Sequence, residues 1–117
     1  MSLNGMNHII IKKMENQKLQ IATNLNKSLI QLGVQERGYS IKPSLVLTME
    51  RIEQDLKNID NTIDDICTEF PKLKIKTLKE ILRLGSLGAY GKTYKLSTQE
   101  ICYWIREYLK QNKSKLL

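Results

Sequence analysis

The stretch YGKTYKLSTQEICYWIREYL, residues 90–109, contains the clearest helix start in the chain. Ser97 and Glu100 have the spacing of a capping box, in which the serine oxygen accepts a hydrogen bond from the glutamate backbone and the glutamate carboxylate reaches back to the serine amide. A hydrophobic staple can form around this box, between Leu96 and Ile101. These signals predict that a helix begins at Ser97.

The predicted helix, residues 97–111, has two unlike faces. Apolar residues recur along one face at three- and four-residue steps, the spacing of a buried helix stripe; they are Ile101, Trp104, Ile105, Tyr108 and Leu109. The opposite face is polar and basic and carries Gln99, Cys102, Tyr103, Arg106, Lys110 and Lys113. We expect the first face to pack against the rest of the chain and the second to be exposed.

A second capping box lies upstream of this helix. Thr77 and Glu80 have the same spacing and predict a helix over residues 77–94. Glycines at positions 85, 88 and 91 interrupt it, and each costs roughly 0.8–1 kcal/mol of helix stability relative to alanine. They indicate either a break near Gly85 or a backbone that another helix approaches closely.

The strongest periodicity in the chain lies in residues 45–70. Apolar residues follow alternating steps of four and three there: Leu45, Met49, Ile52, Leu56, Ile59, Ile63, Ile66 and Phe70. The pattern predicts one long helix, capped by Ser44 or Thr48 and ended by Pro71, because the residue before a proline is pushed out of helical geometry. The stripe must be buried inside this chain or against a second copy, and small bundles favour the first.

Signals in the N-terminal third are weaker. One apolar stripe predicts a helix over residues 15–32, ended by Gly33; it consists of Leu19, Ala22, Leu25, Leu29 and Leu32. Residues 34–43 are polar and contain Gly38 and Pro43, so we expect a loop.

The predicted fold class is all-α, a small helical bundle. It consists of a long two-helix hairpin, residues 15–70, followed by a compact helix-turn-helix-like pair, residues 77–111. We expect residues 15–111 to form a single domain, with a flexible arm at 1–14 and a basic tail at 112–117.

The net charge of +7 is distributed unevenly. Residues 1–43 carry +4, residues 44–70 carry −5 and residues 71–117 carry +8. An excess of that size in the C-terminal part should attract polyanions, whereas the acidic middle should repel them.

An enzyme or metal site has little to build on. The single histidine is His8, the two cysteines (Cys67 and Cys102) form no CxxC pair, and no phosphate-binding or nucleophile motif is present. Acidic residues around Asp64 lack the spacing of a calcium loop. We therefore expect no catalytic residues, no metal, no cofactor and no small-molecule substrate.

The cellular setting follows from similar absences. No run of about 18 apolar residues exists, so the sequence predicts no membrane span, and the N-terminal stretch lacks the order of a signal peptide. Two unpaired cysteines are typical of a reduced compartment. We expect a cytoplasmic protein.

Residues 91–104 resemble a helix-turn-helix segment. Gly91 occupies the place of the close helix–helix contact, Leu96-Ser97 that of the turn, and Ile101 and Trp104 the buried side of the second helix. Lys95 stands where such turns usually carry glycine. Glu100 adds a negative charge to the first turn of the second helix.

The resemblance implies that the second helix enters the major groove of DNA. Thr98, Gln99, Cys102, Tyr103 and Arg106 would then face the bases, and Lys92, Lys95, Lys110 and Lys113 would contact phosphates. The alternative is a helical hairpin in a bundle, with Trp104 and Tyr108 as ordinary core residues.

A second resemblance covers about half of the chain. It is carried by LTMERIEQ (47–54), KLKIKTLKEIL (72–82), GAYGKTY (88–94) and the spaced residues Ile101, Trp104, Ile105, Tyr108 and Leu109. These segments are similar to a family of small, uncharacterised proteins from phages and mobile elements of Bacteroidetes. The resemblance implies a bacterial setting and an accessory role around phage or plasmid DNA.

Two functions are therefore expected. The first is a non-enzymatic nucleic-acid-binding accessory protein whose partner is duplex DNA. The alternative is an interaction or scaffold protein that binds no nucleic acid and pairs with a second copy through the stripe in residues 45–70, or with another phage or replication protein.

Overall fold

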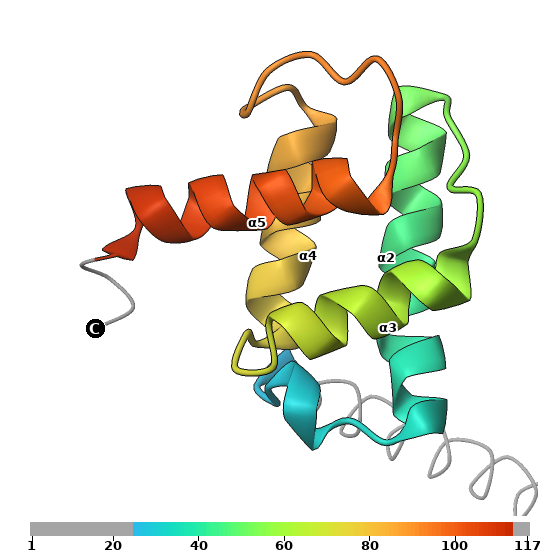
Figure 1. Cartoon of the computed structure of the whole chain (residues 1–117), viewed down its shortest axis with the longest axis vertical. Helices are drawn as coiled ribbons and strands as arrows, with labels where there is room; N and C mark the ends of the chain where they lie inside the picture. The colour runs from blue at the N-terminus through green and yellow to red at the C-terminus, as the bar shows by residue number, and fades with distance from the viewer. Residues whose placement is uncertain (1–24, 114–117) are drawn as a thin grey trace, which may run out of the picture.

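The computed structural model describes residues 25–113 and confirms the all-α fold class. Its elements are the 3₁₀ turn η1 (Leu29–Gln31) and the helices α2 (Val34–Ile52), α3 (Ile59–Glu69), α4 (Ile75–Ser86) and α5 (Thr98–Gln111). Helices α2 and α4 run side by side, and α3 and α5 lie across them (Figure 1). The described part of the chain is thus a two-layer bundle of short helices.

The core lies between the two layers and draws on every helix. Trp104 is its largest fully buried side chain. Around it lie Leu29 of η1, Ile41 and Leu45 of α2, Ile63 and Ile66 of α3, Leu78, Ile81 and Leu82 of α4, and Ile101 and Ile105 of α5. Burial of a side chain of this kind stabilises the fold by about 1.5–3 kcal/mol.

The long helix predicted for residues 45–70 is divided. Helix α2 ends at Ile52, and Glu53 adopts a left-handed conformation with φ 56°. The backbone amide of Gln54 then donates to the Met49 carbonyl oxygen at 3.1 Å, which closes the helix end. Residues 53–58 connect α2 to α3, so the chain turns here although the apolar heptad spacing continues through this segment.

The apolar stripe itself is buried within this chain, as we favoured from the sequence. All eight of its residues belong to the core cluster or pack against it. The turn at residues 53–58 keeps the stripe inward on both helices. It therefore offers no exposed seam for a second copy in the described fold.

A local signal for the second helix start was present in the sequence. The Asn58 side chain accepts a hydrogen bond from the Asn61 backbone at 3.0 Å and caps α3. Asparagine is among the strongest N-cap residues. A helix start at Asn58 is compatible with the same heptad spacing, so periodicity alone could not reveal the break.

Residues 34–43, predicted to be a loop, belong to α2. Burial explains the error, because Ile41 continues the inward row of Leu45 and Thr48 by one turn. Pro43 is exposed and lies on the outer side of the helix. The helix caps predicted at residues 44 and 48 are also wrong: both residues lie inside α2, where the Thr48 hydroxyl donates to the Ser44 carbonyl oxygen at 2.8 Å.

Most of the helix predicted for residues 15–32 lies outside the described residues, as does the arm at 1–14. Its last part does not continue as an α-helix up to Gly33. Residues 27–30 instead run antiparallel to residues 71–75. The amide of Leu29 donates to the Leu73 carbonyl oxygen, and the amide of Ile30 to that of Pro71, both at 2.8 Å.

This backbone pairing explains why α4 begins before the predicted Thr77. The amide of Ile75, a donor that the helix start leaves free, donates to the Lys27 carbonyl oxygen at 3.0 Å. Thr77 consequently lies within the first turn of α4. The predicted capping box does not form, and the Glu80 carboxylate accepts from the Tyr108 hydroxyl at 3.0 Å instead.

Helix α4 ends at Ser86, eight residues before the predicted end. The two interpretations of the glycines both hold at Gly85, since the helix ends beside it and α5 approaches it. A Cβ atom at Gly85 would overlap the indole ring of Trp104. Gly88 and Gly91 have positive φ angles of 86° and 104°, which favour glycine and turn the chain away from the helix.

Replacing Gly85 with alanine should destabilise the fold, although alanine favours helices. We expect Gly85→Ala to lower the free energy of unfolding by about 1–3 kcal/mol, the usual cost of overpacking a core. Gly38 of α2 is the matched control, because a Cβ atom there meets nothing within 4 Å. Gly38→Ala should raise the free energy of unfolding by about 0.5–1 kcal/mol in the same urea titration. Equal effects at the two sites would contradict this packing.

Candidate nucleic-acid interface

The start of α5 is formed largely as predicted. The Ser97 hydroxyl oxygen accepts from the backbone amide of Glu100 at 3.1 Å. The second half of the box is replaced, because the Glu100 carboxylate accepts from the Trp104 indole at 3.1 Å and from the Thr93 hydroxyl at 3.4 Å. The negative charge of Glu100, which is unfavourable in a helix that contacts DNA, is thus turned inward, where it orients the buried Trp104.

Gln54 holds the chain just before α5. Its side-chain amide donates to the Tyr94 carbonyl oxygen at 2.7 Å, and its side-chain oxygen accepts from the Leu96 amide at 2.6 Å. One side chain in the α2–α3 connection therefore satisfies two backbone groups that lie 40 and 42 residues further along the chain. This contact fixes where α5 begins.

Most of the residues predicted for the outward face of the last helix are exposed. They lie at steps of four and three along α5 and just past its end: Gln99, Tyr103, Arg106, Lys110 and Lys113. Thr98 lies off this face, and its hydroxyl shares a 2.8 Å hydrogen bond with that of Thr62 in α3. Cys102, expected to face outward, is buried.

The connection between α4 and α5 differs from a helix-turn-helix turn. It comprises residues 87–97, whereas such a turn has about three to four residues. Gly91 lies in this connection and a Cβ atom there would meet nothing within 4 Å, so Gly85 takes the close-contact role that the sequence assigned to Gly91. Lys92 and Lys95 are exposed in the same connection, with the Lys92 ammonium 5.3 Å from the Tyr94 ring centre.

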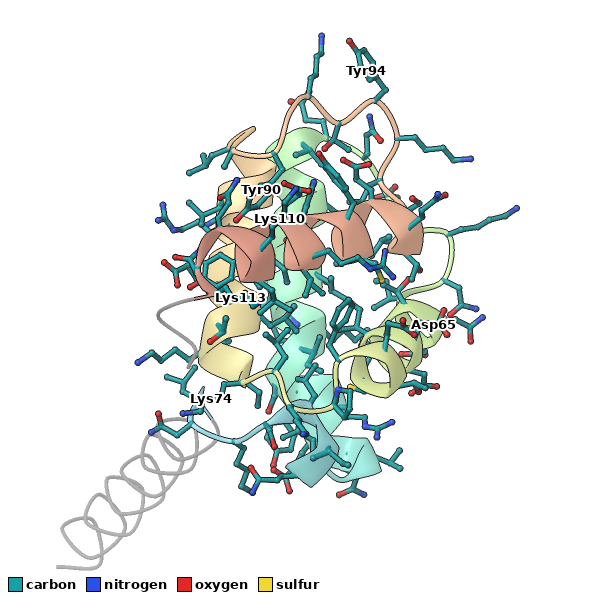
Figure 2. All side chains as sticks on the ribbon, turned by 60° about the vertical axis from the view of Figure 1, so that its left-hand side comes forward. Asp65, Lys74, Tyr90, Tyr94, Lys110 and Lys113 are labelled. Atoms are coloured by element: carbon teal, nitrogen blue, oxygen red, sulfur yellow. The ribbon has the colours of Figure 1, made fainter. Side chains whose placement is uncertain are left out.

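The predicted basic residues are consequently spread along α5 and the connection before it. The connection that carries Tyr94 lies at one end of the described fold, and Lys113 lies well away from it, just past the end of α5 at Gln111 (Figure 2). Helix α5 spans about 20 Å at 1.5 Å per residue. The predicted site residues therefore do not form one compact cluster.

Acidic residues of α3 lie close to α5 around Cys102 and Arg106. Arg106 is 3.8 Å from the Glu69 carboxylate and lies over the Phe70 ring, 5.8 Å from its centre. Burial is the main cause that raises the pKa of the Cys102 thiol; Arg106 lowers it, and Glu69 and Asp65 raise it further. A phosphate approaching this part of α5 would meet these two carboxylates.

The second half of the α5 face has basic neighbours that the site prediction missed. Lys72, Lys74 and Lys76 are exposed on the α3–α4 connection and the start of α4. They line one cleft together with Phe70, Pro71, Tyr108 and Leu109, and the Glu69 carboxylate, which lies 3.8 Å from Arg106, lines the same cleft. Lys74, Lys110 and Lys113 lie on the same side of the molecule, away from Asp65 (Figure 2).

The described part of the chain holds no carboxylate within 4.0 Å of these five lysine ammonium groups, at positions 72, 74, 76, 110 and 113. The sequence showed the basic run in PKLKIK. Its proximity to the end of α5 depends on the pairing of residues 27–30 with 71–75, which no local pattern indicates. We define these five lysines as the lysine surface.

Residues 25–113 contain no cluster of three or more histidine, cysteine or acidic side chains that could hold a metal ion. Burial is the main cause that raises the pKa of Cys67 as well as that of Cys102, and both cysteines are free. Helices long and apolar enough to cross a membrane are also absent from the described residues.

In comparisons with known proteins, no family model, no curated protein and no solved structure matches this chain. Function must therefore be argued from the surfaces of the chain itself.

The two thiols should react slowly in the folded protein. Each pKa unit of increase lowers the thiolate fraction about tenfold below the pKa, and burial also hinders the reagent. At pH 8, we expect Cys67 and Cys102 to react with a chromogenic disulfide many times more slowly in buffer than in guanidinium chloride. Rapid titration of either thiol in the folded protein, assigned with Cys67→Ala and Cys102→Ala, would contradict their burial.

Proposed function

We propose that this chain is a non-enzymatic accessory protein that binds nucleic acid by its phosphates through the lysine surface. The observation that carries the proposal is the presence of five exposed lysines on the α3–α4 connection, the start of α4 and the end of α5 with the residues just past it. None of them has a described carboxylate within 4.0 Å of its ammonium group, and the one carboxylate that lines their cleft, Glu69, lies 3.8 Å from Arg106. Duplex DNA is the proposed partner. The setting in a phage or mobile element is supported by the sequence resemblance alone.

The chemistry of the surface favours phosphate contact over base recognition. Lysine presents a flexible point charge, whereas specific base contacts usually come from forked or planar side chains. The residues best placed to read bases, Gln99 and Tyr103, lie on either side of Cys102 in the sequence, and the charges of the α3 carboxylates Asp65 and Glu69 act on the Cys102 thiol. Phosphate contacts fix orientation and affinity but carry no sequence information directly. We therefore expect weak sequence preference.

The backbone under the surface is already ordered. Residues 71 and 73 accept hydrogen bonds from the amides of residues 30 and 29, and the amide of residue 75 donates to residue 27. Binding through Lys72 and Lys74 would therefore order side chains on a backbone that is held in place. A smaller entropic cost on binding supports this part of the chain as the contact site.

Binding should depend steeply on salt. Each phosphate neutralised changes the slope of log affinity against log salt concentration by about 0.9 for duplex DNA. Replacing Lys72, Lys74 and Lys110 with alanine should therefore reduce the slope by about two to three units, as measured by fluorescence anisotropy with a labelled duplex.

A matched control removes three lysines from elsewhere, Lys57, Lys92 and Lys95, and leaves the same net charge as the first variant. We expect it to reduce the slope by less. A larger loss in the control would move the interface to the α4–α5 connection. No binding of the unmodified protein at low salt would refute the nucleic-acid proposal and favour the scaffold alternative.

A further inference from the structure

The outer face of α2 is an apolar surface that the lysine surface does not use. Tyr39, Val46 and Leu47 are 56%, 37% and 44% exposed, and Pro43 is exposed between them. These positions fall on one side of the helix, opposite the buried row of Ile41, Leu45 and Thr48. Exposed apolar residues grouped on one face indicate a contact surface more often than scattered ones do.

The shape of this face suits a second helix. A shallow hollow runs along it, lined by Gly38, Lys42, Pro43, Val46, Leu47 and Glu50. Gly38 contributes no side chain to the hollow, and the space beyond its backbone is open to 4 Å. A helix can approach closely where a small residue leaves such a gap.

The charges on the face have a regular placement. Lys42 precedes Val46 by four residues and Glu50 follows it by four, so each lies about 6 Å from Val46 along the helix axis. If two copies pair antiparallel about Val46, Lys42 of each copy lies opposite Glu50 of the other. A parallel pair would place like charges together, which is unfavourable.

We propose that this face joins two copies of the chain, with their α2 helices antiparallel across a two-fold axis near Val46. The face is self-complementary in charge, as such an interface requires. It also carries no excess positive charge, since Lys42 and Glu50 balance, so a polyanion is a poorer occupant than a second copy. This dimer is distinct from one built on the buried stripe of residues 45–70.

A dimer of this kind should dissociate on dilution. One helix on each side covers less area than the roughly 800 Å² per partner that is usual in stable complexes. We therefore expect the full chain to pass from monomer to dimer between micromolar and millimolar concentration in sedimentation equilibrium.

Charge reversal tests the antiparallel arrangement directly. Lys42→Glu would place two glutamates together and Glu50→Lys two lysines, so each should weaken dimerisation about tenfold or more. The double variant restores opposite charges and should return the dissociation constant to within a few-fold of the original. Asp60→Asn is the control for Lys42, because the two form a 4.0 Å ion pair within one chain, and it should leave dimerisation unchanged.

An apolar substitution provides a second test. Val46→Asp should abolish the dimer, whereas Val34→Asp, at an apolar position that is 87% exposed on the first turn of α2, should not. Circular dichroism checks that each variant keeps its helices. A wild-type chain that stays monomeric throughout would overturn the proposal. So would a dimer that persists in the Val46→Asp variant while the double charge reversal fails to restore what the single reversals weaken. Neither result depends on nucleic-acid binding.

Discussion

The packing of Trp104 against Gly85 is the contact on which the arrangement of this molecule depends. Helix α5 can lie this close to α4 only because residue 85 has no side chain. The Trp104 indole donates a hydrogen bond to Glu100, one helical turn before it. One turn after it, the Tyr108 hydroxyl donates to Glu80 of α4. The depth of α5 in the bundle thus sets which of its residues face outward, and it brings the end of α5 to the cleft beside residues 72–76.

The sequence indicated this part of the fold well because its signals are local. Ser97 as a cap, the outward row of α5 and the helix end near Gly85 all follow from signals within a single helix or turn, whereas the close helix contact was assigned to Gly91. The division of residues 45–70 was missed because the heptad spacing continues through the turn at Glu53. The first half of α2 was missed because burial of Ile41 outweighs the proline two residues later. Tertiary burial overrides local propensity at these places.

The candidate site, too, could be predicted from the sequence only in part. The exposure of Arg106, Lys110 and Lys113 could be predicted from helix periodicity alone. Their neighbours could not, because Glu69 and Lys74 approach α5 only through the crossing of helices and the pairing of residues 27–30 with 71–75. That crossing brings α3 carboxylates close to Cys102 and Arg106 and lysines to the cleft beside Tyr108, a distribution that the net charge of the C-terminal segment concealed.

The separation of charge between α3 and the lysine surface also has a consequence at long range. Asp65 lies on one side of the molecule, and Lys74, Lys110 and Lys113 lie on another (Figure 2). Such a distribution gives the protein a permanent electric dipole in addition to its net charge. In the field of a polyanion the dipole experiences a torque, so the molecule would turn its lysines forward during diffusion, before any atom makes contact.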